Sequence, residues 1–196
     1  MAIAALAPLA APIAVNTDFI ANKTETIILS TEPLSRDWRV SLHDGTPLLT
    51  IIGESMSASH RKTVSTPDGQ TLYQIRRQLW SMGNTYYAER TEDGPKLWEL
   101  ESHSGFTGQK HKLMFNNVAA GGQPAMLDFK NRKMGGISGE VKLIDQSVAN
   151  IELKRGLLKK DYYVTVAQGV DMSLLVGMVV AIEDRMKTRR AGAAGA

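Results

Sequence analysis

The chain of 196 residues contains no cysteine. Disulfides, thiolate metal sites, a cysteine nucleophile and S-palmitoylation are therefore excluded. The net charge is also small, at +3. The sequence has no dense run of lysine and arginine of the kind that is typical of a nucleic-acid-binding arm. The composition, 43% hydrophobic and 22% charged, indicates a globular protein, and the length fits one domain with a single core.

Long hydrophobic runs are missing as well. The longest, Met172 to Ile182, is interrupted by Ser173 and Gly177. As a helix it measures about 16 Å, whereas a bilayer core needs about 30 Å, so we expect no transmembrane span. The apolar start, MAIAALAPLAAPIAV, has no positive charge and contains two prolines, which argues against a secretion signal. We therefore expect an intracellular protein, cytoplasmic or nuclear, with peripheral membrane association left open.

Motifs for common enzyme chemistry are absent too. The four histidines (His43, His60, His103 and His111) include no pair at metalloprotease spacing and have no cysteine partners. No Gly-x-Ser-x-Gly elbow occurs, and the glycine-rich stretches lack the lysine and the helix of a phosphate loop. We therefore predict no catalytic residue, no metal site and no cofactor, and we expect that the protein is not an enzyme.

Short apolar or alternating runs, separated by turn residues, predict strands from residue 26 onward. The predicted strands are Thr26 to Ser30, Trp38 to Leu42, Leu48 to Ile52, His60 to Ser65, Thr71 to Arg77, Thr85 to Arg90, Lys96 to His103, Lys110 to Asn116, Ala125 to Lys130, Gly136 to Ile144, Val148 to Leu153 and Tyr162 to Ala167. Turns such as Asp44-Gly45 and Asp68-Gly69 supply the positive φ of tight hairpins. The pattern predicts a meander of twelve antiparallel strands.

One helix is predicted after these strands. Asp171 is a suitable N-cap, and helix-compatible residues continue from Met172 to about Lys187. Apolar side chains lie around the whole circumference of its first part, which indicates burial on every side. An enclosed helix in an all-β chain favours a closed barrel with the helix inside, because closure also removes the sheet edges. The predicted fold is therefore mainly β, a closed twelve-stranded antiparallel barrel around a buried C-terminal helix.

Three stretches carry a family resemblance: WRVSLHDGTPLLTIIGE (38–54), SHRKTVSTPDGQTLYQIRRQ (59–78) and YYVTVAQGVDMSLLVGMVVAIEDR (162–185). Their order of strand, turn, hairpin, last strand, Val-Asp loop and core helix resembles the LURP-one-related family. That family is a branch of the Tubby C-terminal-like superfamily, which is distantly similar to phospholipid scramblases. The resemblance implies an Ala/Pro-rich, partly flexible segment at residues 1–25, a barrel domain at 26–188 and a flexible tail at 189–196.

The resemblance implies little about activity. Relatives with this fold include tubby-like proteins, which bind phosphoinositide headgroups and act in the nucleus, and scramblases. The tubby-type lipid motif and the scramblase-type calcium stretch are not found in this sequence, and no catalytic residue is carried over.

The residues themselves offer a basic segment as a candidate site. Residues 110–160 carry 10 Lys and Arg against 4 Asp and Glu. The predicted anion-binding residues are Lys130, Arg132, Lys133, Lys154, Arg155, Lys159 and Lys160, which lie near strand ends. Such cations can bind an anionic membrane surface; a solvated surface is the ordinary alternative. We therefore expect an interaction module whose partner is an anionic lipid headgroup or membrane surface. The alternative is a protein-binding or transcription-regulatory adaptor without a lipid role.

Overall fold

The computed structural model of the chain describes residues 6–31, 35–54, 59–79, 85–105, 108–131, 136–156 and 159–194. Its first six strands are β1 (Glu25–Thr31), β2 (Trp38–Leu42), β3 (Pro47–Gly53), β4 (Lys62–Ser65), β5 (Thr71–Arg77) and β6 (Thr85–Glu89). The other six are β7 (Lys96–Gly105), β8 (Gly108–Asn117), β9 (Gln123–Asn131), β10 (Gly139–Leu143), β11 (Gln146–Arg155) and β12 (Lys160–Val166). The helix α1 (Met172–Ala194) follows, and two short 3₁₀ turns are η1 (Thr17–Phe19) and η2 (Val118–Ala120).

The strands form one closed antiparallel barrel. Each strand pairs with its neighbours in sequence, and β1 closes the barrel by pairing with β12. Every paired strand therefore has a partner on both sides, which satisfies backbone groups that an open sheet would leave at its edges. Alternation is clear in β1, where Ile27 and Leu29 point inward and are completely buried. The predicted twelve-stranded barrel is confirmed.

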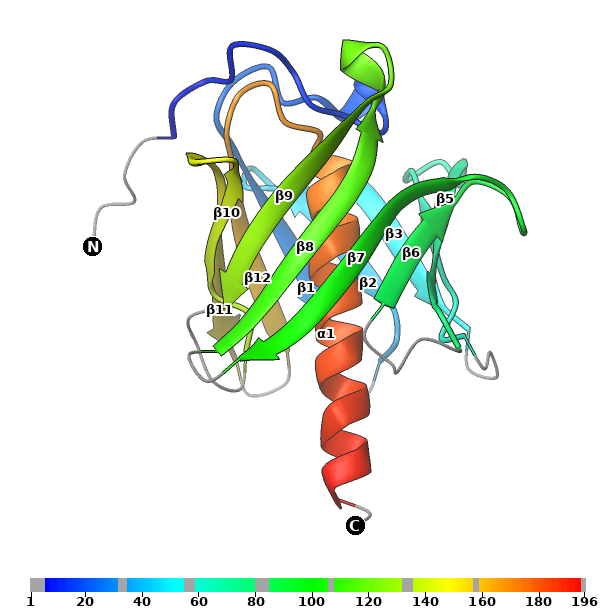
Figure 1. Ribbon diagram of the computed structural model, residues 1–196. Coiled ribbons are helices and arrows are strands. Elements are labelled where there is room, and N and C mark those ends of the chain that lie inside the picture. Colours follow the sequence, from blue (N-terminus) through cyan, green and yellow to red (C-terminus); the bar gives the residue numbers. More distant parts are fainter. Residues whose placement is uncertain are drawn as a thin grey trace.

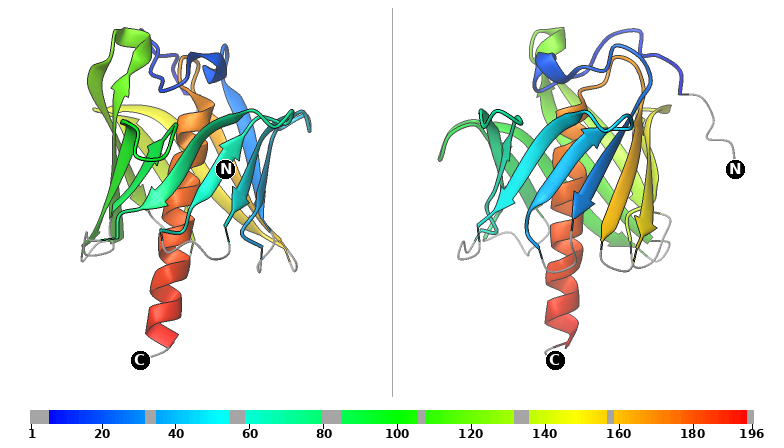
Figure 2. Two further views of the ribbon diagram at one scale, coloured as in Figure 1. Left: turned by 90° about the vertical axis from the view of Figure 1, so that its right-hand side faces the viewer. Right: turned by 180° about the vertical axis from the view of Figure 1, so that it is seen from behind.

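Helix α1 passes along the inside of the barrel and projects beyond it (Figures 1 and 2). Every residue from Asp171 to Met186 is buried. The wall comes close at Gly177, where a Cβ atom would stand 2.8 Å from Trp98 and 2.9 Å from the Tyr73 hydroxyl. The Tyr73 hydroxyl also donates to the backbone carbonyl of Ser173 at 2.6 Å. The absence of a side chain at Gly177 therefore lets the helix fit against this part of the wall.

We call the end of the barrel where α1 begins the entrance end, and the end where α1 leaves it the exit end. Residues 6–21, which we call the strap, cross the entrance end (Figure 1). The Asp171 carboxylate accepts hydrogen bonds from the strap amides of Val15 and Asn16, at 3.0 and 2.8 Å. Its second oxygen caps α1 through the amides of Ser173 and Leu174. One buried side chain thus joins strap and helix.

Candidate functional site

The predicted basic residues gather at the exit end, because β9 and β11 end there and β12 begins there. Lys130 lies one residue before the end of β9, and Lys154 and Arg155 complete β11. Lys159 precedes β12, and Lys160 is its first residue. Arg132 and Lys133 lie outside the described residues. Residues separated by up to 30 positions in sequence are thus brought to one end of the barrel.

These cations have different surroundings. The Lys154 ammonium lies 4.0 Å from the centre of the Tyr163 ring, a cation–π contact on the outer wall. The Lys159 ammonium lies 3.2 Å from the Asp161 carboxylate but keeps 63% of its side chain exposed. Lys160 instead turns inward and pairs with Glu183 of α1 at 2.8 Å, where the carboxylate is almost completely buried. Lys130, Lys154, Arg155 and Lys159 are therefore the exposed members of the set.

Two carboxylates on α1 fix the helix at this end. Glu183 also accepts a hydrogen bond from the Tyr162 hydroxyl at 2.7 Å. The next residue, Asp184, points about 100° further around the helix and meets another part of the wall. There it pairs with Lys62 and accepts a hydrogen bond from the Tyr86 hydroxyl at 2.9 Å. Burial, together with the nearby carboxylate in each case, raises the pKa of both tyrosines, so these hydroxyls keep their protons and act as donors.

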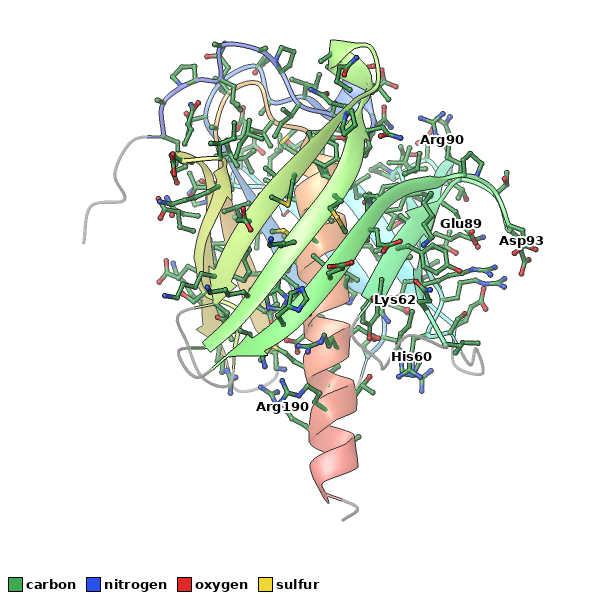
Figure 3. The ribbon with its side chains drawn as sticks, viewed as in Figure 1. His60, Lys62, Glu89, Arg90, Asp93 and Arg190 are labelled. Carbon is green, nitrogen blue, oxygen red and sulfur yellow. The ribbon has the colours of Figure 1, made fainter. Side chains whose placement is uncertain are left out.

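Figure 3 shows His60 and Lys62 beside the lower part of α1, and Arg190 on its projecting turns. The His60 ring lies 3.2 Å from the Asp184 carboxylate. Partial burial nevertheless lowers the pKa of His60. The projecting part of α1 carries exposed Arg189 and Arg190, which add positive charge to the exit end.

A buried histidine lies inside the wall. His111 of β8 is 1% exposed, stacks on Phe129 and shares a 2.8 Å hydrogen bond with the Ser102 hydroxyl. Burial, aided by the positive charge of Arg185, lowers the pKa of His111 to about 3. The ring is therefore neutral at physiological pH. The Arg185 guanidinium is itself buried, and burial lowers its pKa.

The entrance end has the opposite charge. Its six connections carry four exposed acidic residues, namely Asp44, Asp68, Asp93 and Asp145, against one exposed basic residue, Arg90. Two further acidic residues there are compensated or enclosed, because Glu92 pairs with Arg61 and Arg76, and Asp171 is buried. Figure 3 shows Arg90 and Asp93 around the β6–β7 turn, away from His60 and Lys62. The barrel is thus electrically polar along its axis, with exposed cations at the exit end.

Two of the hollows in the described part of the chain are considered as candidate sites. One, of about 410 Å³, lies on the outer wall over β7, β8 and β9, and includes Leu97, Met114 and Met126. The other, of about 340 Å³, lies between the strap and the β4–β5 and β6–β7 turns, and includes Phe19 and Arg90. Neither hollow is lined by a histidine or by two carboxylates, so neither presents an acid–base pair among the described residues.

Among the described residues, no three histidine, aspartate or glutamate side chains are placed to hold a metal ion. None of the described helices has the length and apolar character needed to cross a bilayer.

Sequence reasoning missed the contacts that fix α1 at the exit end. Glu183 and Asp184 were visible only as an acidic end to an apolar helix, and Lys62 as a basic residue that enters a strand. Their partners come from four different strands or connections, so only the barrel register brings them together. One local signal was present. Glu183 and Asp184 follow directly after the apolar run that ends at Ile182, which indicates that this first charged turn of the helix is still enclosed.

The fold places the chain in the class of closed twelve-stranded antiparallel barrels that enclose their own C-terminal helix. A profile described as LOR, LURP-one-related, matches residues 26–184. The chain therefore belongs to the LURP-one-related family, which confirms the resemblance. The X-ray structure of a protein from Arabidopsis thaliana is similar, with a TM-score of 0.57 and 13% identity, covering 88% of this chain and 98% of that one. At that identity the likeness shows the fold alone. No match to a curated protein was found.

Proposed function

We propose that this chain is a non-enzymatic interaction module that binds anionic phospholipid headgroups, including phosphoinositides, at a membrane surface. Its exit end provides the contact. The observation that carries the proposal is the gathering of exposed Lys130, Lys154, Arg155 and Lys159 at one end of a barrel whose opposite end is acidic. Arg132 and Lys133 belong to the same proposed set by their place in sequence.

The geometry supports a docked orientation. A flat anionic surface attracts the exit end and repels the acidic entrance end, so electrostatics alone orients the barrel with its axis toward the membrane. Each well-placed lysine or arginine contributes about 1 kcal/mol near such a surface. Four exposed cations therefore give about 4 kcal/mol, roughly a thousandfold in affinity. Because these charges are exposed, added salt weakens the attraction.

Lys160 has a different role in the proposal. Its charge is already compensated by the buried Glu183 carboxylate, and only 18% of its side chain is exposed. We therefore expect Lys160 to secure α1 beneath the binding surface, where it contributes less to lipid contact than its exposed neighbours.

Co-sedimentation with phosphatidylcholine vesicles, with and without phosphatidylserine or a phosphoinositide, tests the proposal. A double reversal at the exit end, Lys154→Glu with Lys159→Glu, should weaken binding to anionic vesicles at least about tenfold. The matched control reverses two exposed cations at the entrance end, Lys23→Glu with Arg90→Glu, and should bind like the wild type or slightly less. Lys23 contacts Glu25 at 3.6 Å much as Lys159 contacts Asp161, so the pairs are comparable.

Salt provides a second arm of the same experiment, because an electrostatic contact must weaken as ionic strength rises. The proposal is wrong if the wild type binds neither lipid, or if both double variants lose binding equally. In that case a protein-binding adaptor is the function to pursue.

A further inference from the structure

A row of side chains crosses the outer wall close to the exit end. Antiparallel pairing places His103 of β7 opposite Lys110 of β8, and Lys110 opposite Lys130 of β9. The next strand places Glu140 opposite Lys130. Neighbours in the chain at alternate positions, such as Ser102, His111 and Phe129, point into the core, so His103, Lys110 and Lys130 share the outer face and are exposed.

The row beside it follows another pattern. Glu101 lies opposite Lys112, Lys112 opposite Asp128, and Asp128 opposite Lys142. Signs alternate along this row, so each charge faces its opposite across the ladder, which stabilises a sheet. In the row nearer the exit end two lysines face each other, and like charges directly opposite destabilise strand pairing. The two rows cross the same four strands, and only the row nearer the exit end places like charges opposite each other.

Within the described part of the chain, no ion pair compensates the two opposed lysines. The carboxylate opposite Lys130, Glu140, lies 3.7 Å from the ammonium of Lys142, and the carboxylate of Glu101 lies 3.5 Å from the ring of His103. Neither Lys110 nor Lys130 forms an ion pair with a described carboxylate. Cβ atoms of directly opposite residues are about 5 Å apart, so two long side chains can converge on one small anion.

We propose that Lys110 and Lys130, with His103 beside them, bind the phosphate of a phosphomonoester. The inference rests on the proposed function and deepens it, because it names the headgroup chemistry that the exit end selects. A phosphomonoester carries a charge of about −1.5 to −2 near neutral pH and offers three acceptor oxygens. A carboxylate or a phosphodiester carries a single negative charge, so it neutralises only one of two opposed ammonium groups.

The neighbouring groups favour this arrangement. His103 is 63% exposed in its side chain and adds a ring N–H donor on the far side of Lys110. Lysine also suits a mobile phosphate, because its ammonium is a point charge on a flexible stem. The same chemistry is found on a lipid headgroup and on a soluble metabolite.

The first arm of the test uses soluble probes and two-dimensional amide NMR of the whole chain. Glycerol 3-phosphate, a monoester, should shift the amides of His103, Lys110 and Lys130, whereas glycerophosphocholine, a diester, should bind at least tenfold more weakly. Lys110→Gln with Lys130→Gln should reduce monoester affinity at least tenfold. The matched control, Lys112→Gln with Lys142→Gln, removes the same charge from the alternating row and should retain it.

Thermal unfolding separates a binding role from a structural one. Removal of the opposed lysines relieves repulsion, so Lys110→Gln with Lys130→Gln should unfold at the same temperature as the wild type or higher. The control variant loses favourable cross-strand pairs and should unfold at a lower temperature. A lower unfolding temperature for the Lys110 and Lys130 variant would overturn the proposal, because the pair would then stabilise the wall.

The second arm uses vesicles matched in surface charge that contain either phosphatidic acid, a monoester, or phosphatidylglycerol, a diester. The wild type should prefer phosphatidic acid. The Lys110 and Lys130 variant should bind both lipids equally, and more weakly than the wild type binds phosphatidylglycerol, because Lys130 also belongs to the exposed cations of the exit end. Equal binding to both lipids, with no soluble monoester binding, overturns the phosphate site and leaves the membrane proposal intact. Soluble monoester binding without vesicle binding supports the phosphate site and rejects the membrane proposal.

Discussion

The two ends of the barrel fix the same helix by different means. At the entrance end, Asp171 accepts backbone amides from both strap and helix, so one buried carboxylate satisfies several main-chain donors. At the exit end, Glu183 and Asp184 pair with cations from the wall. Both ends must offset the cost of burying a carboxylate. Burial raises the pKa of Asp171, and hydrogen bonds to its carboxylate oppose that rise, whereas cations compensate Glu183 and Asp184. The comparison indicates that hydrogen bonds to backbone amides hold the helix at the entrance end, and that ion pairs with the wall hold it at the exit end.

The largest expected effect is at the entrance end. Asp171→Ala removes the helix cap, which costs about 1 kcal/mol, and leaves several buried amides without an acceptor at about 1 to 3 kcal/mol each. We expect the free energy of unfolding to fall by about 4 kcal/mol. Urea denaturation measures it. Asp18→Ala, at an exposed position in η1, should change it by less than about 0.5 kcal/mol; similar losses for both variants would contradict the comparison.

The second largest expected change in the free energy of unfolding is at the exit end. Glu183→Ala leaves the Lys160 ammonium without its carboxylate in a mostly buried setting, and breaking one side of such a pair costs about 3 kcal/mol. Lys159→Ala, which removes an exposed neighbour, should cost less than about 1 kcal/mol. Both values come from the same denaturation experiment. Equal losses would show that the buried pair does not secure the helix.

The pH dependence of stability sharpens the contrast further. The pKa of His111 is about 3 in the folded chain and 6.5 without burial, so the folded state binds fewer protons. Stability from this group is present above pH 6.5 and is lost as the pH falls toward 3. By pH 5 the wild type should lose about 2 kcal/mol through His111. His111→Phe should flatten the curve between pH 6.5 and 5, whereas exposed His103→Gln should leave it unchanged; parallel curves for all three proteins would disprove the assignment.

The smallest expected effect concerns the outer wall. Lys154→Ala removes the contact with the Tyr163 ring and should lower the free energy of unfolding by about 0.5 kcal/mol. A double-mutant cycle with Tyr163→Leu isolates this pairwise energy. A coupling above about 2 kcal/mol would mean that Lys154 is a structural residue, which would weaken its place in the binding surface.

The sequence predicted the parts of this molecule that depend on local patterns. Alternation and Asp-Gly turns located all twelve strands, and the all-round apolar surface of residues 172–182 required an enclosure. Contacts that depend on barrel register were out of reach, such as the meeting of Lys62 with Asp184. The strap carried no periodic signal, because its bonds to Gly169, Val170 and Asp171 are made by backbone groups that any residue possesses.

The candidate site divides in the same way. Strand-end cations such as Lys154 and Lys159 could be proposed from their spacing, because hairpin connections lie at barrel ends. That Lys160 turns inward to Glu183 could not, since this depends on where the helix leaves the barrel. The opposition of Lys110 and Lys130 also needed the register of β8 and β9. The sequence alone does not show which residue a given lysine faces on the neighbouring strand.

The absence of native cysteine allows the most direct test of which end meets the membrane. A single cysteine that carries a polarity-sensitive dye can replace Gly156 at the exit end or Ala120 at the entrance end, both exposed. On addition of phosphatidylserine vesicles, the dye at Gly156→Cys should shift to the blue and the dye at Ala120→Cys should not. A shift at Ala120→Cys alone, or equal shifts at both positions, would contradict docking through the exit end.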